Sequence, residues 1–232
     1  MSLRAILNSA RTLVYYERLQ QILANNLANV STDGYKADIF GLRAVPGTTR
    51  PEPITALDLR QGSFRETGRQ LDLALHGPGF FVVETPAGER LSRGGGLRLD
   101  AAGQLVDVHD NPVLGVDGPL FITGAEIEVQ ANGTVIVDGT TIGKLRVETV
   151  DDPATLQKEQ GTLFVASGPL RSVDPVETRV RQGAIEESNF DPVLGMVDLI
   201  TVAREFHANL TALRAMDDVL GSVANDIGRP LP

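Results

Sequence analysis

The sequence predicts an α+β fold, with long helices at the two ends of the chain and an all-β domain between them. Near both ends, apolar residues recur every three to four positions, which is the spacing of one helix face. The middle instead has short apolar or alternating runs, separated by Gly, Pro, Asn and Asp at intervals of roughly 8–12 residues. That spacing is typical of a β-sandwich or a β-barrel.

Composition narrows the class of protein. The chain has 232 residues, a net charge of −9 and no cysteine. Its length fits one large domain or two small ones. The negative charge disfavours binding to nucleic acid or to an anionic membrane surface. Without cysteine there is no disulfide and no Cys-ligated metal. Charged residues interrupt the first apolar stretch, so we expect no cleavable signal peptide and no membrane insertion.

The first helix is predicted from residue 2 to about residue 30. Its apolar stripe contains Leu19, Leu23 and Leu27. Three asparagines are interleaved with this stripe, although Asn is a poor helix former because its amide competes for backbone hydrogen bonds. We expect them to bond across helix contacts and so to fix the register of packing. The helix ends at Ser31–Gly34, where Gly34 is placed to take a positive φ.

The chain then runs through a connector rich in proline, from Ala37 to about Pro53, into the predicted β domain. Asn132-Gly133 predicts a tight hairpin. Asp152 and Pro153 are placed as the cap and the first residue of a short helical turn. We expect the Gly94–Gly96 run to loosen its hairpin. The predicted strands are Leu71–Leu75, Phe80–Glu84, Gln104–Asp107, Ile127–Gln130, Thr134–Val137, Gly143–Val150 and Leu163–Ala166.

The second long helix is predicted from Pro192 to about Ile227, with Asn189 or Asp191 as its cap and a stop at Gly228 and Pro230. Its stripe keeps steps of three and four over about four heptads, the pattern of a coiled-coil seam. We therefore expect the terminal helices to pack together in a coiled-coil-like unit, although an ordinary helix bundle has the same local pattern. The seam includes Met196, Leu199, Phe206, Leu210, Leu213 and Leu220.

The expected domains are residues 1–45 with 182–232 as a helical terminal domain, and residues 46–181 as a central β domain. The sequence offers no catalytic, metal or cofactor site. The three histidines share no metal-ligand spacing, and no nucleophile motif occurs. Glu186 and Glu187 are interpreted as favourable charge near a helix N-terminus. We expect a protein that is not an enzyme and needs no cofactor.

Two motifs carry a resemblance to a known family. The segment from Asn25 to Lys36 resembles the N-terminal signature of flagellar basal-body rod and hook proteins, A-N-N-[LI]-A-N-x-x-T-x-G-[FY]-[KR]. The segment Gln182–Phe190, with Gly183, Ser188 and Asn189, resembles the C-terminal Q-G-x-L-E-x-S-N-[VF] motif of the same family. Smaller blocks at Gln61–Ser63, Gly77–Val83 and Arg93–Val106 lie between the two motifs, in the order of the family. The first motif is matched at Asn25, Asn26, Leu27, Ala28, Asn29, Gly34, Tyr35 and Lys36.

The resemblance implies a structural component of the flagellar rod, the shaft that transmits torque from the motor to the hook. It implies subunits that pack their terminal helices into a tube, with the β domain outside. The implied partners are copies of the chain, other proximal and distal rod proteins and the flagellar type III export apparatus, which needs no cleaved signal. The implied location is the basal body in the cell envelope.

Three alternatives remain at this stage. The short connector between Lys36 and Gln61 favours a proximal rod protein, with a distal rod protein as the alternative. A peptidoglycan hydrolase would need paired carboxylates or a Cys/His site, which the sequence does not offer. A soluble adaptor would be a compact monomer with well-protected ends.

Overall fold

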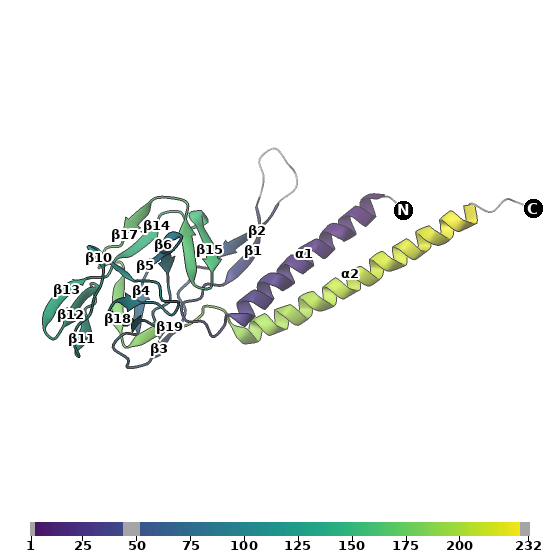
Figure 1. Cartoon of the computed structure of the whole chain (residues 1–232). Coiled ribbons are helices and arrows are strands. Elements are labelled where there is room, and N and C mark those ends of the chain that lie inside the picture. The colour runs from purple at the N-terminus through teal and green to yellow at the C-terminus, as the bar shows by residue number, and fades with distance from the viewer. Residues whose placement is uncertain (1–2, 44–51, 228–232) are drawn as a thin grey trace, which may run out of the picture. The chain divides into compact units, whose positions relative to one another are not determined.

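The structure is a computed structural model that describes residues 3–43 and 52–227. Helices α1 (Leu3–Ala28) and α2 (Pro192–Ile227) lie at the two ends of the chain, and the middle is built of strands (Figure 1). The α+β class with a central β region is therefore consistent with the structure. The prolines of the connector at positions 46 and 51 and the predicted helix stop at Gly228 and Pro230 lie outside the described residues.

The chain forms two compact units. The helical unit consists of Met1–Ala28, Phe40–Thr55 and Asp191–Pro232, and the β unit of Asn29–Ile39 and Ala56–Phe190. The expected domain boundaries, at residues 45/46 and 181/182, stay a prediction. Segments 29–39 and 182–190, which flank the long helices in sequence, belong to the β unit.

In the helical unit, α1 and α2 run antiparallel and in contact (Figure 1). The Asp191 carboxylate accepts hydrogen bonds from the backbone N–H groups of Val193 and Leu194, at 2.8 and 3.1 Å, and so caps α2. Strands β1 (Asp38–Arg43) and β2 (Glu52–Leu57) pair with each other. The rings of Tyr15 and Phe40 meet edge to face with centroids 4.8 Å apart, which places β1 beside α1.

The expected coiled-coil-like packing of the helices is wrong. A coiled coil buries its seam residues in holes of the partner helix. Here Met196 is exposed and the other five predicted seam residues are only half-buried. Among the described apolar residues of both helices, only Ile22, Leu23 and Val202 are buried. Heptad spacing shows that a helix has an apolar face, but it does not show that one neighbouring helix covers that face.

The β unit is built from short strands that are separated by tight turns. After β1 and β2 they are β3 (Phe64–Glu66), β4 (Leu73–His76), β5 (Phe80–Thr85), β6 (Gly88–Ser92), β7 (Arg98–Leu99), β8 (Leu105–Val106), β9 (Leu114–Gly115), β10 (Gly118–Pro119), β11 (Ile127–Val129), β12 (Thr134–Val137), β13 (Thr140–Lys144), β14 (Val147–Val150), β15 (Leu156–Gln160), β16 (Leu163–Ala166), β17 (Leu170–Ser172), β18 (Arg179–Gln182) and β19 (Ala184–Glu186).

One six-stranded sheet, in the order β15-β16-β6-β5-β14-β17, organises the unit. Its strand β5 is buried on both faces. Phe81 and Val83 belong to one apolar core and Phe80 and Val82 to another, as the alternation of a strand requires. The other described strands form two- and three-stranded sheets. The expected β-sandwich or β-barrel is therefore corrected to one open sheet with a core on each face and small sheets around it.

Several turn predictions are confirmed. Asn132 and Gly133 connect β11 to β12, and Gly133 has φ +86°. Asp152 caps the 3₁₀ turn Pro153–Thr155, with Pro at its start. The single strand predicted over Gly143–Val150 is wrong, because it divides into β13 and β14. At the break, the N–H of Leu145 donates to Gly133 O and that of Arg146 to Leu114 O, so the chain changes partners.

Candidate functional site

The two motif-bearing segments meet inside the β unit. The backbone N–H of Gly34 donates to the carbonyl of Glu186 at 2.7 Å, and that of Asn189 to the carbonyl of Tyr35 at 3.4 Å. The amide N–H of Ala37 donates to the side chain of Asn189 at 2.8 Å. The first and last segments of the β unit are therefore adjacent. We call Gly34–Ala37, Glu186–Asn189 and the residues bonded to them the signature junction.

A buried ion cluster lies at the centre of the signature junction. The Lys36 ammonium lies 2.6 Å from Glu186 Oε1, and Arg93 Nε lies 2.7 Å from Glu186 Oε2. All three side chains are buried: Lys36 is 2% exposed, Arg93 is 4% exposed and Glu186 is 1% exposed. The backbone N–H of Gly62 also donates to Glu186 Oε1, at 2.9 Å. One carboxylate thus ties together segments that are distant from it in sequence.

Both cations also donate to backbone carbonyls. Lys36 Nζ donates to Arg60 O at 2.8 Å. Arg93 donates to the carbonyls of Leu75 and Gly77 at 2.9 and 2.7 Å, and to Gly79 O. Arg93 therefore fixes the Gly77-Pro78-Gly79 turn as well as binding the carboxylate. Together, these hydrogen bonds offset part of the free-energy cost of removing the two cations from water.

The cluster shifts the pKa values of its members. Burial alone would raise the pKa of Glu186, but the charges of Arg93 and Lys36 and the hydrogen bonds outweigh it, so the pKa lies below its ordinary value. Burial lowers the pKa of Lys36, and the attraction of Glu186 offsets this only in part. Glu186 is therefore a charged structural group, and not a proton donor or acceptor poised near neutral pH.

Close backbone contacts explain two glycines of the motifs. Gly34 has φ +72°, and a Cβ there would lie 2.4 Å from the backbone of Arg93. At Gly62, a Cβ would lie 2.0 Å from the carbonyl oxygen of Glu187. No side chain fits at those distances. The positive φ predicted for Gly34 is confirmed, and the reason for glycine includes the lack of space as well as the turn.

Asn189 and Tyr35 complete the signature junction. The Asn189 amide donates to the carbonyls of Asp58 and Arg60 at 2.7 and 3.0 Å, so its side chain joins three segments of the chain. Tyr35 is buried, and the Lys158 ammonium lies 4.0 Å from the centroid of its ring, within the range of a cation–π contact. Lys158 Nζ also donates to Lys36 O at 2.6 Å.

The structure divides the predicted site residues into two groups. Gly34, Tyr35, Lys36 and Asn189 come together in the signature junction. Ser188 accepts a hydrogen bond from Phe190 N, and Gly183, with φ +76°, accepts from Thr67 N at 2.8 Å. The remaining members of the first motif are the last residues of α1 and the residue after it: Asn26 is buried, Leu27 and Asn29 are half-buried, and Asn25 and Ala28 are exposed. Their predicted part in assembly contacts stays a prediction.

The sequence does not reveal the central pair of the site. Arg93 belongs to one of the smaller motif blocks, and Glu186 is interpreted from the sequence as favourable charge near a helix N-terminus. Glu186 instead lies in β19, where it binds Lys36 and Arg93. The sequence does offer one sign of this cluster, because Lys36, Arg93 and Glu186 are charged residues that lie in three different motif blocks. Within residues 3–43 and 52–227, no group of three or more His, Cys, Asp or Glu side chains is arranged to hold a metal ion.

Comparisons with known proteins match the same two segments. The family described as "Flagella basal body rod protein" matches residues 17–36, and "Flagellar basal body rod FlgEFG protein C-terminal" matches residues 181–227. The chain is 31% identical to the flagellar basal-body rod protein FlgF of Escherichia coli (strain K12), over 87% of this chain and 89% of the relative. The chain belongs to the family of flagellar basal-body rod proteins.

Other rod proteins agree with this assignment. FlgF of Rhizobium meliloti (strain 1021) is 33% identical, over 89% of each chain. FlgG of Agrobacterium fabrum (strain C58) is 28% identical, over 97% of this chain and the whole relative. The protein is a structural component of the flagellar basal-body rod, of the proximal FlgF-like type, and these relatives are rod proteins and not enzymes. Among the helices described here, neither is long and apolar enough to span a membrane.

Proposed function

We propose that the helical unit is the part of this rod subunit that polymerises, and that it buries its apolar faces against copies of itself and against other proximal and distal rod proteins. The supporting observation is the start of α2. Val193, Val197 and Ile200 lie on one face of the helix and are 69%, 57% and 53% exposed. A continuous exposed apolar face of this kind marks an interaction surface.

The asparagines of the first motif support this role. Asn25 is exposed while Asn26 is buried, so the two side-chain amides of this pair lie in different surroundings. In the proposed assembly the exposed Asn25 lies against an adjacent chain, and a polar side chain in such a contact favours one register of subunits.

The signature junction serves the same function from inside the β unit. It holds the entry and exit segments of the chain in fixed positions, so that a force applied at either segment is passed to a rigid body. The subunit thereby transmits torque along the rod. The protein reaches the cell envelope through the flagellar type III export apparatus, and Glu186, which is held between two cations, serves as a structural group.

A charge on the exposed face of α2 tests the proposal. Val197→Asp leaves the isolated subunit folded, because the side chain is already more than half in water, and it blocks incorporation into basal bodies. Complementation of a strain that lacks its own proximal rod protein is the measurement, with motility and purified basal bodies as readouts. Leu213→Asp is a less specific variant, because Leu213 is half-buried and its replacement also disturbs the helix pair.

The matched control is Val176→Asp in the β unit. Val176 is an isolated apolar residue that is 85% exposed, so the same chemical change is made away from the proposed interface. We expect cells with this variant to swim normally. Motile cells carrying Val197→Asp would contradict the assignment of polymerisation to this face.

A further inference from the structure

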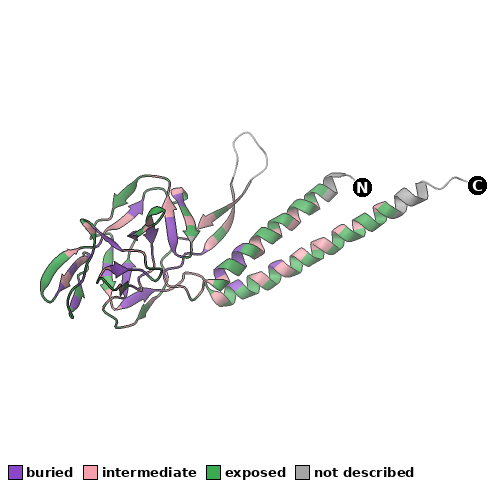
Figure 2. Ribbon diagram, in the orientation of Figure 1, coloured by how far each residue is buried: buried purple, intermediate pink, exposed green. Residues whose placement is uncertain are grey.

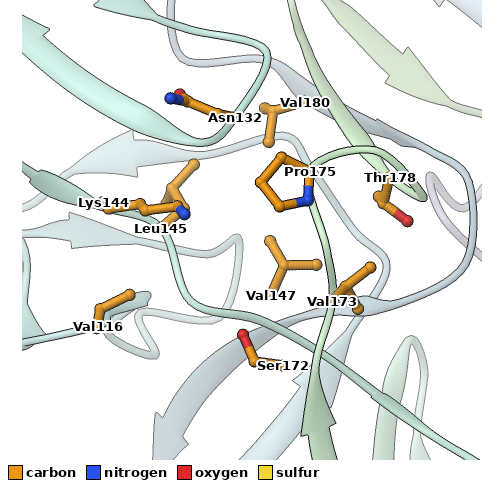
Figure 3. Close-up of a pocket in the computed structure, with 10 residues that line it drawn as sticks. All are labelled: Val116, Asn132, Lys144, Leu145, Val147, Ser172, Val173, Pro175, Thr178 and Val180. Carbon is orange, nitrogen blue, oxygen red and sulfur yellow. The ribbon is translucent and has the colours of Figure 1, made fainter.

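A cavity of about 310 Å³ lies in the β unit beside the signature junction. This volume falls at the lower end of the range for sites that bind small molecules, about 300 Å³ and above. The cleft shown in Figure 3, between Leu145, Val147 and Val180, has only about 40 Å³, room for a few waters at most. Of these two cavities, the larger one has space for an organic ligand.

The wall of the larger cavity is asymmetric in charge. It contains Lys36 and Arg93, while none of the aspartates or glutamates that the structure describes lines it. Glu186 binds both cations without being a lining residue. With the neighbouring pair of Arg60 and Asp58, the cluster has three cations and two carboxylates. One positive charge therefore remains in excess, and the two buried cations lie at the cavity.

Both buried cations also keep a donor to spare. An ammonium has three N–H bonds, and the acceptors of Lys36 are Arg60 O and Glu186 Oε1. A guanidinium has five, and Arg93 uses four, on Glu186 and on the carbonyls of the 75–79 segment. Within the described chain, one N–H of each cation thus has no acceptor. Both cations line the cavity, so an anion there can accept these two N–H groups in charge-assisted hydrogen bonds.

We propose that this cavity binds a small carboxylate, whose oxygens accept hydrogen bonds from Lys36 and Arg93. The remaining walls include Leu59, Phe80 and Val150, which suit a short apolar tail. A singly charged group matches the single excess charge, whereas a doubly charged phosphate would be desolvated with half its charge uncompensated. The carboxylate is either a free short-chain acid or the side chain of a glutamate. The inference does not depend on the proposed assembly of the helical unit.

The test is an NMR titration of the full-length chain. Butyrate should shift the backbone amides of Gly77, Gly79 and Val150 saturably, with a Kd on the order of millimolar. The chemical shift of the distant Gly133 amide should not change, and the neutral isostere butyramide should have no effect.

A capped Ala-Glu-Ala tripeptide, compared with Ala-Gln-Ala, distinguishes the two sources of the carboxylate. Binding of butyrate alone indicates a free acid, and binding of the glutamate peptide indicates a side chain. No saturable shift with either, or equal shifts with butyramide, overturns the proposal.

A pair of cavity variants makes the test specific. Leu57 and Leu59 both pack against the core cluster that contains Phe80 and Phe164, but only Leu59 lines the cavity. Leu59→Phe should weaken butyrate binding at least about tenfold, while Leu57→Phe should leave it within about twofold. Thermal unfolding of both variants shows that each is folded. Unchanged affinity in folded Leu59→Phe would place the ligand elsewhere and overturn the proposal.

Discussion

The β unit and the helical unit differ in how far each completes its own core. In the β unit, strand β5 alone places four consecutive side chains, Phe80–Val83, at 4% exposure or less. In the helical unit, buried side chains are few and the predicted seam of α2 is half-exposed or exposed throughout, a difference that the colours of Figure 2 make visible. One unit is thus a finished domain, while the other has an apolar surface whose burial depends on further chains.

The sharpest prediction concerns the buried ion cluster of the β unit. Glu186→Gln keeps the shape of the side chain but leaves Lys36 and Arg93 buried without their counter-ion. We expect a loss of about 3–5 kcal/mol in the free energy of unfolding, measured by urea denaturation of the β-unit signal. The control is its neighbour Glu187→Gln. The Glu187 side chain is 41% exposed and pairs with Arg65 at 3.2 Å, so its loss should be within about 1 kcal/mol. Equal losses would show that burial does not govern the strength of the cluster.

The next prediction compares one leucine from each unit. Leu75→Ala removes a side chain that is 1% exposed and should cost about 2–5 kcal/mol in the isolated subunit. Leu210→Ala removes a half-buried side chain from α2 and should cost about 1 kcal/mol or less. Chemical denaturation of both variants, followed by circular dichroism, is the measurement. Similar costs would mean that the helix pair is packed as completely as the β core, and the contrast would be lost.

Two adjacent glycines give a smaller, local test of packing in the β unit. A Cβ on Gly95 would lie 1.6 Å from the carbonyl oxygen of Leu73, whereas the nearest atom to a Cβ on Gly94 is 3.4 Å away. Gly95→Ala must push apart two paired segments, and we expect a loss of about 1–3 kcal/mol. For Gly94→Ala we expect a change within about 0.5 kcal/mol in thermal unfolding. A tolerated Gly95→Ala would indicate that these segments can move apart at little cost.

The smallest effect is a dependence on pH confined to the β unit. Because the pKa of Glu186 is lower in the folded than in the unfolded chain, folding is favoured above the ordinary glutamate pKa of about 4.3 and loses this contribution as pH falls. Asp58 acts in the same direction, since its bond to Arg60 lowers its pKa. The acid side of the stability curve should therefore carry the contribution of both carboxylates.

The measurement for this prediction is the urea midpoint of the β unit between pH 7 and pH 3. The midpoint of the wild-type protein should fall more steeply than that of Glu186→Gln, which has no carboxylate to protonate at this position. Parallel curves for the two proteins would show that Glu186 contributes nothing to the acid sensitivity.

The sequence predicted what depends on local residues. The α2 start at Pro192 with its Asp191 cap, the turn at Asn132-Gly133 and the positive φ of Gly34 all follow from side-chain chemistry within a few positions. The strand β16 was predicted at its observed bounds for the same reason. Each of these features is decided by the backbone preferences of the residues that form it.

The features that the sequence did not predict depend on partners distant in the chain. Nothing near Glu186 shows that Lys36 and Arg93 lie against it, because they come from other motif blocks. The Gly94–Gly96 run suggested a loose hairpin, whereas Gly95 is tightly packed against Leu73. The seam of α2 has the spacing of a coiled coil, but the number of helices that cover an apolar face is decided by all the chains around it, and one sequence does not contain that information.

The adjacency of Gly34 and Glu186 has a consequence for how the family can vary. The first and last segments of the β unit meet at neighbouring backbone groups, so the body between them has closely spaced ends, but it includes Phe40–Thr55, which belongs to the helical unit. Insertions with closely spaced ends are exchanged or lengthened with little effect on the host that carries them. A graft of a foreign body onto this protein at residues 34 and 186 must therefore also supply a segment in place of Phe40–Thr55, or the helical unit loses its pair of strands.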